Sequence, residues 1–298
     1  MKHTNMKRYL NILSMVVLAG TVGLLSVSCS SEEDNEDKAV SKKSPLKISV
    51  ATVATTRAFF EGTKLPDECV YHLFLFNSKG VIEYGANKLS VKYVKGESLI
   101  ATPVYVTDNG KVVAVYGNNE YIEGNAIIPI NTEKQQDILV ASSSVKPEYP
   151  EVSLTFKHIM ARVALRITKS AENNRTYEFG QATINGVRSG SYYLYNEKQG
   201  NYGERTSLIV KAKDNSVLSS ATDVVEYEFL TLPQSSSELN FTLSGSLNTT
   251  HNLPGKTLYG GNRYVFNAVI KGSNLEIQSV SVEPWSQETH EMEIDLNK

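Results

Sequence analysis

The chain has 298 residues with nearly balanced charge, 30 Lys and Arg against 32 Asp and Glu, and a hydrophobic fraction of 41%. This is the composition of an ordinary globular protein, and a net charge of −2 creates no field that would attract nucleic acid. Two cysteines are too few for a disulfide scaffold or a cysteine-rich zinc module.

Residues 1–28 have the layout of a secretory signal. Three basic residues precede an uncharged run over residues 9–25, and small residues then lead to Cys29. Residues 26–29 (SVSC) resemble the lipobox of bacterial lipoproteins, in which the cysteine is diacylated and the bond before it, here between Ser28 and Cys29, is cut. The first position of this segment departs from the motif, which usually carries Leu or Val there. The alternative is a retained membrane helix, because the uncharged run is at the lower limit for crossing a membrane.

A polar segment follows Cys29. Residues 30–37 read SSEEDNED and residues 38–47 read KAVSKKSPLK, a composition that predicts a solvated tether. A serine and acidic cluster directly after a lipid-bearing cysteine also resembles the signal that exports lipoproteins of bacteroidete bacteria to the outer face of the outer membrane. Lipidation of Cys29 would leave Cys69 as the one free thiol, and a disulfide between the two stays open only without it.

From Leu46 onward the sequence predicts an all-β fold, because short stretches rich in Val, Ile, Thr, Tyr and Phe recur between turn residues. The expected strands cover residues 45–56, 69–77, 81–84, 89–94, 99–106, 111–116, 126–130, 154–168, 175–184, 191–195, 207–211, 224–232, 239–247, 263–271, 275–283 and 291–296. Only residues 132–138 have a helical pattern, for about two turns.

Two prolines in residues 146–150 (KPEYP) interrupt the strand pattern and predict a domain boundary. We therefore expect an N-terminal domain over residues 58–148 and a C-terminal domain over residues 149–298. The stretch after the boundary, residues 154–168, is apolar at every second position in its second half and predicts one continuous strand.

The sequence has no recognisable catalytic or metal-binding pattern. It lacks G-x-S-x-G and P-loop motifs, and no two histidines beyond the signal lie within a helical turn of each other. His290-Glu291 begins like H-E-x-x-H, but Ile294 stands where the second histidine is needed. We expect no enzyme, no metal and no cofactor, and we expect His158 to be a partly buried, hydrogen-bonded histidine.

Tyr192, Tyr193 and Tyr195 allow two interpretations. They could stack on sugar rings, in which case the chain would be a monomeric, surface-exposed glycan-binding lipoprotein, or they could pack across strands. The sequence leaves both open.

Taken together, the sequence resembles the fimbrillin family, the type V pilus subunits of bacteroidete bacteria. Besides the lipoprotein signal and the acidic tether, the resemblance is carried by residues 55–59 (TTRAF), 156–163 (FKHIMARV), 261–264 (GNRY) and 282–285 (VEPW). It implies two antiparallel β-sandwich domains of transthyretin-like topology. It also implies an adhesive, non-enzymatic subunit of a pilus (fimbrium), with a stalk role favoured over a tip role. Such a subunit reaches the cell surface as an outer membrane lipoprotein.

The resemblance further implies assembly by donor-strand exchange with other pilus subunits. In that family an Arg-specific protease cuts after the arginine of the first strand, which frees the subunit from its lipid and removes that strand. A strand from the next subunit, usually its C-terminal tail, fills the groove. In this chain the cut would fall between Arg57 and Ala58, so residues 29–57 would be a propeptide.

The apolar patterns at both ends agree with this scheme. Leu46, Ile48 and Val50 alternate with polar residues, so the first strand can bury one side. In the tail, residues 286–298, the same alternation recurs at Met292, Ile294 and Leu296, which is the pattern that a donor strand needs. Two alternatives stay open: the tail could complete its own domain, and the segment around Arg57 is also compatible with a plain linker.

Overall fold

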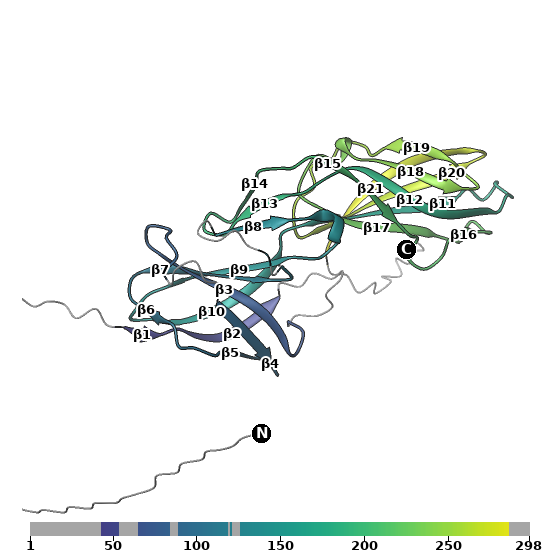
Figure 1. Cartoon of the computed structure of the whole chain (residues 1–298). Coiled ribbons are helices and arrows are strands. Elements are labelled where there is room, and N and C mark those ends of the chain that lie inside the picture. The colour runs from purple at the N-terminus through teal and green to yellow at the C-terminus, as the bar shows by residue number, and fades with distance from the viewer. Residues whose placement is uncertain (1–42, 54–64, 84–88, 119, 121–125, 286–298) are drawn as a thin grey trace, which may run out of the picture. The chain divides into compact units, whose positions relative to one another are not determined.

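The computed structural model describes residues 43–53, 65–83, 89–118, 120 and 126–285 (Figure 1). These residues form strands joined by turns, with two short 3₁₀ turns, η1 (Thr132–Lys134) and η2 (Ser236–Glu238), as the only helical elements among them. The all-β prediction is confirmed. In this part of the chain no helix has the length and apolarity needed to cross a membrane.

The N-terminal half contains a seven-stranded sheet in the order β2-β10-β9-β7-β3-β4-β5. Its strands are β2 (Lys47–Val53), β3 (Cys69–Asn77), β4 (Leu89–Val94), β5 (Glu97–Ile100), β7 (Gly110–Tyr116), β9 (Leu139–Val145) and β10 (Glu151–His158). Neighbours are antiparallel except β2 and β10, which are parallel. A small additional pair joins β1 (Ser44–Pro45) to β6 (Tyr105–Val106). One face of the large sheet encloses an apolar core, the N-terminal core, which includes Tyr71, Val112 and Leu154.

The C-terminal half contains two sheets that enclose a second apolar core, the C-terminal core, which includes Val163, Ile184 and Phe266. A four-stranded sheet has the order β17-β11-β20-β21, with β11 and β20 parallel, and a second sheet has the order β15-β12-β18-β19, with β16 beside β12. The strands are β11 (Ala161–Lys169), β12 (Tyr177–Arg188), β15 (Arg205–Val210), β16 (Val217–Leu218), β17 (Val225–Thr231), β18 (Asn240–Gly245), β19 (Thr249–Asn252), β20 (Asn262–Lys271) and β21 (Asn274–Pro284).

A third apolar core, the junction core, draws side chains from both halves. It includes Phe74 of β3, Val113 of β7, Leu230 of β17 and Trp285 after β21. It also takes side chains from a three-stranded sheet in the order β14-β13-β8, formed by β8 (Ile127–Ile130), β13 (Gly190–Tyr193) and β14 (Lys198–Gly200). Because this core is shared, the two halves are joined by packed apolar side chains as well as by the chain itself.

The single strand expected over residues 154–168 is wrong. β10 ends at His158 and β11 begins at Ala161, and between them the chain leaves the seven-stranded sheet for the four-stranded one. Gly260 and Gly261, directly before β20, lie against the segment where the chain changes sheets. Gly261 N donates a hydrogen bond to the Met160 carbonyl oxygen at 2.9 Å. A Cβ on Gly260 would lie only 2.6 Å from the Ile159 carbonyl oxygen, so this close approach requires glycine. The expected domain boundary between residues 148 and 149 therefore falls between two hydrogen-bonded neighbours, β9 and β10.

Further expectations about elements differ from the structure or lie outside it. In place of the strand expected at residues 81–84, the described residues 81–83 form only an isolated bridge from Ile82 to Phe76. Residues 99–106 form two short strands, β5 and β6, instead of one, and the helical pattern of residues 132–138 is realised only as the 3₁₀ turn η1. Asn131 accepts a hydrogen bond from Glu133 N at 2.9 Å, which caps that turn. The strand expected at residues 291–296 lies outside the described residues.

Candidate functional site

The candidate assembly site is the edge strand β2 and the groove that it fills. β2 stands at one end of the seven-stranded sheet and runs parallel to β10, in register from Lys47 with Glu151 to Val53 with Phe156. Just before the strand, Leu46 N donates a hydrogen bond to the Val104 carbonyl oxygen at 2.7 Å. Among the described strands β10 is the one ladder partner of β2, so the other edge of β2 is paired with no described strand.

The buried side chains of this segment follow an alternation that changes phase at Ser49. Leu46 is 5% exposed in the N-terminal core, and Ile48 packs against that core. The register shifts at Ser49, because Ile48 pairs with Val152 and the next pair joins Val50 to Ser153. An extra residue in one strand moves the following side chains to the opposite face, and Ala51 is accordingly buried at 4% exposure. The side chain of Val50 lies outside the described ones.

The groove that removal of β2 would open is lined by apolar side chains. Val152, Leu154 and Phe156 of β10 alternate into the N-terminal core at 2%, 0% and 0% exposure. The Phe156 ring meets the Tyr71 ring edge to face, with centroids 5.4 Å apart. Without β2, these side chains and the free edge of β10 would face solvent, which is the arrangement that an added strand relieves.

The free energy contributed by packing this strand against β10 and the N-terminal core is large relative to the stability of a domain. Three apolar side chains contribute about 1.5 to 3 kcal/mol each when well buried, with smaller values for alanine. Each backbone hydrogen bond to β10 adds about 1 kcal/mol. The sum is on the order of 5 to 10 kcal/mol, against about 5 to 15 kcal/mol for a whole domain.

Most of the remaining site residues expected from the sequence lie outside the described residues. These are Ser28, Cys29, Arg57, Ala58, Met292, Ile294 and Leu296. What the structure places is the chain on either side of them: β2 ends four residues before Arg57, and Trp285 directly precedes the tail.

Trp285 is fixed in the junction core by a buried aromatic and polar cluster. Its side chain is 1% exposed and its ring stacks on the His158 ring, with centroids 4.4 Å apart and planes 20° apart. His158 Nδ1 lies 2.6 Å from Asp137 Oδ2, and their side chains are 0% and 8% exposed. Sequence reasoning did not bring these residues together. A signal was present, since the FKHIMARV and VEPW motifs that carried the family resemblance contain His158 and Trp285.

The three tyrosines do not share one exposed face. Tyr192 is buried in the junction core, and burial, with a smaller contribution from the nearby Glu197 charge, raises its pKa to about 12. Tyr193 accepts a hydrogen bond from Asn201 Nδ2 at 2.6 Å, and the Tyr195 ring packs 5.4 Å from that of Phe76. These contacts favour the interpretation in which the tyrosines pack within the protein over the one in which they form a stacking platform for sugar rings.

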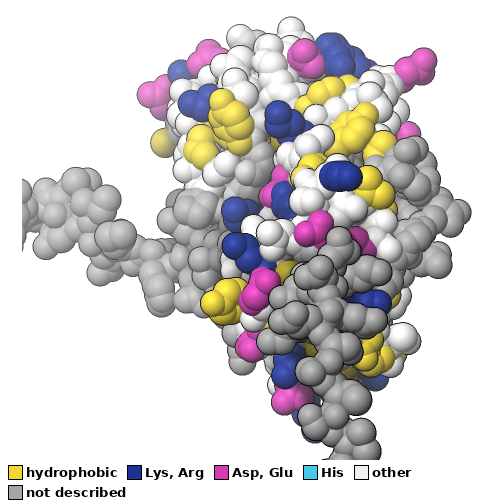
Figure 2. All heavy atoms as spheres, turned by 90° about the vertical axis from the view of Figure 1, so that its left-hand side faces the viewer, with side chains coloured by type: hydrophobic (Ala, Val, Ile, Leu, Met, Phe, Trp, Pro, Cys, Tyr) yellow, Lys and Arg dark blue, Asp and Glu magenta, His cyan; other side chains and the backbone are white. Residues whose placement is uncertain are grey.

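The described residues offer little support for a metal site, a reactive cysteine or a charged binding surface. No group of three or more His, Cys, Asp or Glu side chains among them is placed to hold a metal ion. Cys69 is partly buried, and burial raises the pKa of its thiol to about 11, which disfavours the reactive thiolate. On the face drawn in Figure 2, basic and acidic side chains are interspersed, with no continuous field of one sign.

Comparison with known proteins identifies the family. A model described as fimbrillin-like matches residues 47–285. The chain belongs to the fimbrillin-like family. The resemblance to the fimbrillins drawn from the sequence is thus confirmed.

Two solved structures share this fold at low identity, and a third is a weaker match. A candidate cell adhesion protein from Bacteroides ovatus is 13% identical, with a TM-score of 0.58, and the match covers 83% of this chain and 99% of that one. A second from Bacteroides uniformis is 15% identical, with a TM-score of 0.57 and coverage of 82% and 100%. The fimbrial anchor protein of Porphyromonas gingivalis is 11% identical, with a TM-score of 0.44 and coverage of 81% and 98%. No curated protein matches the chain.

Proposed function

We propose that this chain is a structural subunit of a cell-surface pilus, which polymerises by donor-strand exchange and serves adhesion. A place in the stalk of the pilus is favoured over a place at its tip. The observation that carries the proposal is β2. It is an edge strand with one ladder partner among the described strands, it inserts apolar side chains into the N-terminal core, and it ends four residues before Arg57. An anchor role would retain this strand and leave Arg57 without a function.

The proposed route begins with a lipoprotein precursor. Signal cleavage between Ser28 and Cys29 and lipidation of Cys29 attach the chain to the outer membrane, from which it is exported to the cell surface. An Arg-specific protease then cuts between Arg57 and Ala58 and removes residues 29–57, β2 included. The support is the placement of a protease-compatible arginine just beyond a strand whose loss opens an apolar groove.

The working subunit, residues 58–298, would consist of two transthyretin-like sandwich domains. The separate N-terminal and C-terminal cores support two domains. We retain the division into residues 58–148 and 149–298, with β10 crossing back to complete the N-terminal sheet.

The proposed donor is the tail, residues 286–298, of a neighbouring subunit. Its Met292, Ile294 and Leu296 alternate as a strand that buries one face requires, which matches the spacing of Leu46 and Ile48 before the change of phase at Ser49. The buried Trp285 supports this assignment, because it fixes the point from which the tail leaves the subunit.

The test is to treat the purified precursor with an Arg-specific protease, sequence the new N-terminus and follow assembly by size-exclusion chromatography and electron microscopy. We expect Ala58 as the first residue and filaments or higher oligomers only after cleavage. Arg57→Lys keeps the charge but removes the protease site, and it should stay monomeric. A different N-terminus, or cleaved protein that remains monomeric, would contradict the proposal.

A second pair of variants tests the donor. Ile294→Asp places a charge on the side of the tail that would enter the groove and should abolish assembly, because burying an unpaired carboxylate is strongly unfavourable. Asp295→Asn changes the opposite side and should assemble normally. If Ile294→Asp assembles as well as Asp295→Asn, the tail is not the donor.

A further inference from the structure

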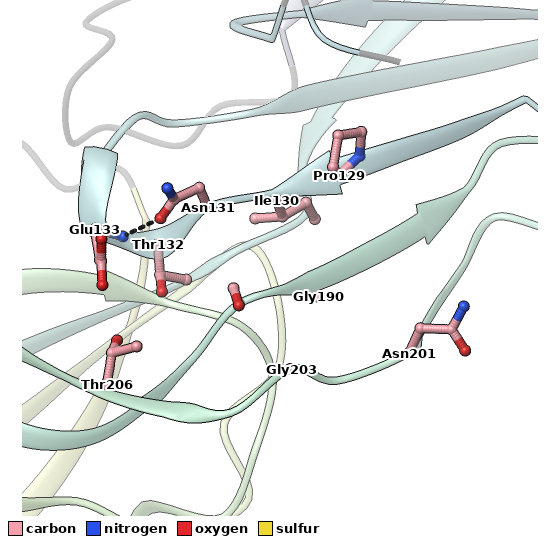
Figure 3. A pocket seen from close by; sticks show the side chains of 10 residues that line it. Pro129, Ile130, Asn131, Thr132, Glu133, Gly190, Asn201, Gly203 and Thr206 are labelled. Atoms are coloured by element: carbon pink, nitrogen blue, oxygen red, sulfur yellow. Dashed lines mark hydrogen bonds between the residues drawn. The ribbon is translucent and has the colours of Figure 1, made fainter. Parts of the chain in front are cut away.

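A separate cavity of about 350 Å³ lies away from the β2 groove. It is bounded by the end of β8 and the turn η1, by the start of β13, and by the loop from β14 to β15 (Figure 3). None of its lining residues belongs to β2 or β10, so the pilus proposal does not use it.

The wall formed by η1 contains a buried hydroxyl group without a partner. Thr132 is 0% exposed, and its Oγ1 makes no hydrogen bond within the described part of the chain. Its carbonyl oxygen, in contrast, accepts from the Gln135 backbone N at 3.1 Å and from Gln135 Nε2 at 2.6 Å, so the turn holds the residue in place. Figure 3 shows the Thr132 side chain directed into the space bounded by Gly190 and Thr206. Since buried polar groups nearly always have partners, this hydroxyl is suited to a group that enters the cavity.

The remaining walls offer both hydrogen-bond acceptors and apolar surface. Asn201 donates its Nδ2 to Tyr193 Oη, which leaves its Oδ1 as an acceptor. Glu133 presents an exposed carboxylate that forms no ion pair within the described residues. Pro129 adds apolar surface, and no Lys or Arg lines the cavity. An anionic ligand would therefore meet a carboxylate and no counter-charge.

We propose that this cavity binds one neutral, hydroxyl-rich ring, a single sugar unit of a glycan. Ring hydroxyls both donate and accept, which matches the Glu133 and Asn201 acceptors on one side and the Thr132 hydroxyl on the other. The C–H face of the ring would lie on the apolar wall at Pro129. The cavity volume falls within the range of about 300 to 1,000 Å³ that small-molecule sites occupy.

The test is calorimetric and NMR titration of the purified full-length chain with the methyl glycosides of glucose, galactose, mannose and N-acetylglucosamine. We expect saturable one-to-one binding of at least one of them, with Kd on the order of 1 mM. Thr132→Val removes the hydroxyl at constant shape and should weaken that binding at least about tenfold, with an unchanged or higher melting temperature because no protein hydrogen bond is lost.

Controls separate a ligand contact from a structural role. Thr242→Val deletes a hydroxyl that bonds Thr250 Oγ1 on β18 and β19, outside the cavity, and should leave sugar binding unchanged. Glu133→Gln keeps an acceptor and should retain binding of a neutral sugar. Saturation by none of the four probes, equal binding by Thr132→Val and the native chain, or a lowered melting temperature in Thr132→Val would each overturn the inference.

Discussion

Glu228 on β17 is the best place to test how charge stabilises the C-terminal half. Its carboxylate is ion-paired with Arg162 of β11 and with Arg263 of β20, in the latter case at 2.9 Å from Nε. The side chains of Glu228, Arg162 and Arg263 are only 8%, 9% and 12% exposed. Glu228 lies opposite Ala164 in register, and that small side chain leaves room for the carboxylate to reach across β11 to β20.

Glu228→Gln should destabilise the protein by about 1.5 to 3 kcal/mol, because it replaces the carboxylate that two largely buried guanidinium groups share with a neutral amide, while Glu226 and Glu283 remain paired with Arg263. Arg263 cannot escape by losing its proton. Burial acts to lower its pKa, but the hydrogen bonds and charges of Glu228, Glu226 and Glu283 outweigh burial and hold the pKa above the usual value. The matched control is Glu276→Gln in the Lys271–Glu276 pair, whose side chains are both 52% exposed and whose loss should cost at most about 1 kcal/mol.

Urea unfolding followed by circular dichroism gives both free energies. We expect Glu228→Gln to lower the urea concentration at the unfolding midpoint strongly, without changing the dependence of the free energy on urea concentration. Glu276→Gln should leave the midpoint almost unchanged. If the two substitutions shift the midpoint equally, the buried network contributes no more than a surface ion pair, and the reasoning from burial is refuted.

Three further predictions follow from packing, backbone geometry and titration. Trp285→Ala should lower the free energy of unfolding by about 3 to 5 kcal/mol, since the ring is 1% exposed, whereas Val282→Ala, at 47% exposure, should change it by less than about 1 kcal/mol; urea unfolding measures both. Gly186→Ala should destabilise far more than Gly96→Ala in the same assay, because both have positive φ but only at Gly186 would a Cβ lie 2.1 Å from the Glu238 carbonyl oxygen. Burial raises the pKa of three tyrosines to about 12, namely Tyr71, Tyr192 and Tyr227. Stability should therefore be intact below the unfolded pKa of about 10 and fall as the pH rises from about 10 to 12, with phenolate absorbance appearing together with loss of circular dichroism; phenolate formation by these tyrosines near pH 10 in folded protein would contradict it.

The sequence predicted those features of the fold that depend on local pattern. The strand predicted at residues 69–77 is β3, with the same bounds, and both of its faces carry apolar side chains. Tyr71, Leu73 and Leu75 enter the N-terminal core, and Phe74 and Phe76 enter the junction core. Val70 is the exception, at 46% exposure, because the strand begins at the rim of the sheet.

Features that depend on the partner strand could not be read from local pattern. The apolar positions change phase between β10, with Val152, Leu154 and Phe156, and β11, with Ala161 and Val163. A change of phase alone does not distinguish a bulge within one strand from a move to another sheet, and the chain makes that move at Ile159 and Met160. The bulge at Ser49 likewise arises from the register against β10. In the same way, Arg162 and Arg166 were recognisable as the polar side of a strand, but their glutamate partners lie 60 or more positions away in sequence.

The location of β2 relative to the three cores bears on how a subunit could lose a strand and remain folded. Among the described residues, Leu46, Ile48 and Ala51 contribute to the N-terminal core, while the C-terminal and junction cores include no side chain from β2. The ion pairs around Glu228 join β11, β17, β20 and β21, none of which belongs to the seven-stranded sheet. Removal of β2 would therefore withdraw on the order of 5 to 10 kcal/mol from one core and leave the others intact. The free energy available to a replacing strand is then concentrated at the N-terminal core, because the described side chains of β2 contribute to neither of the other two cores.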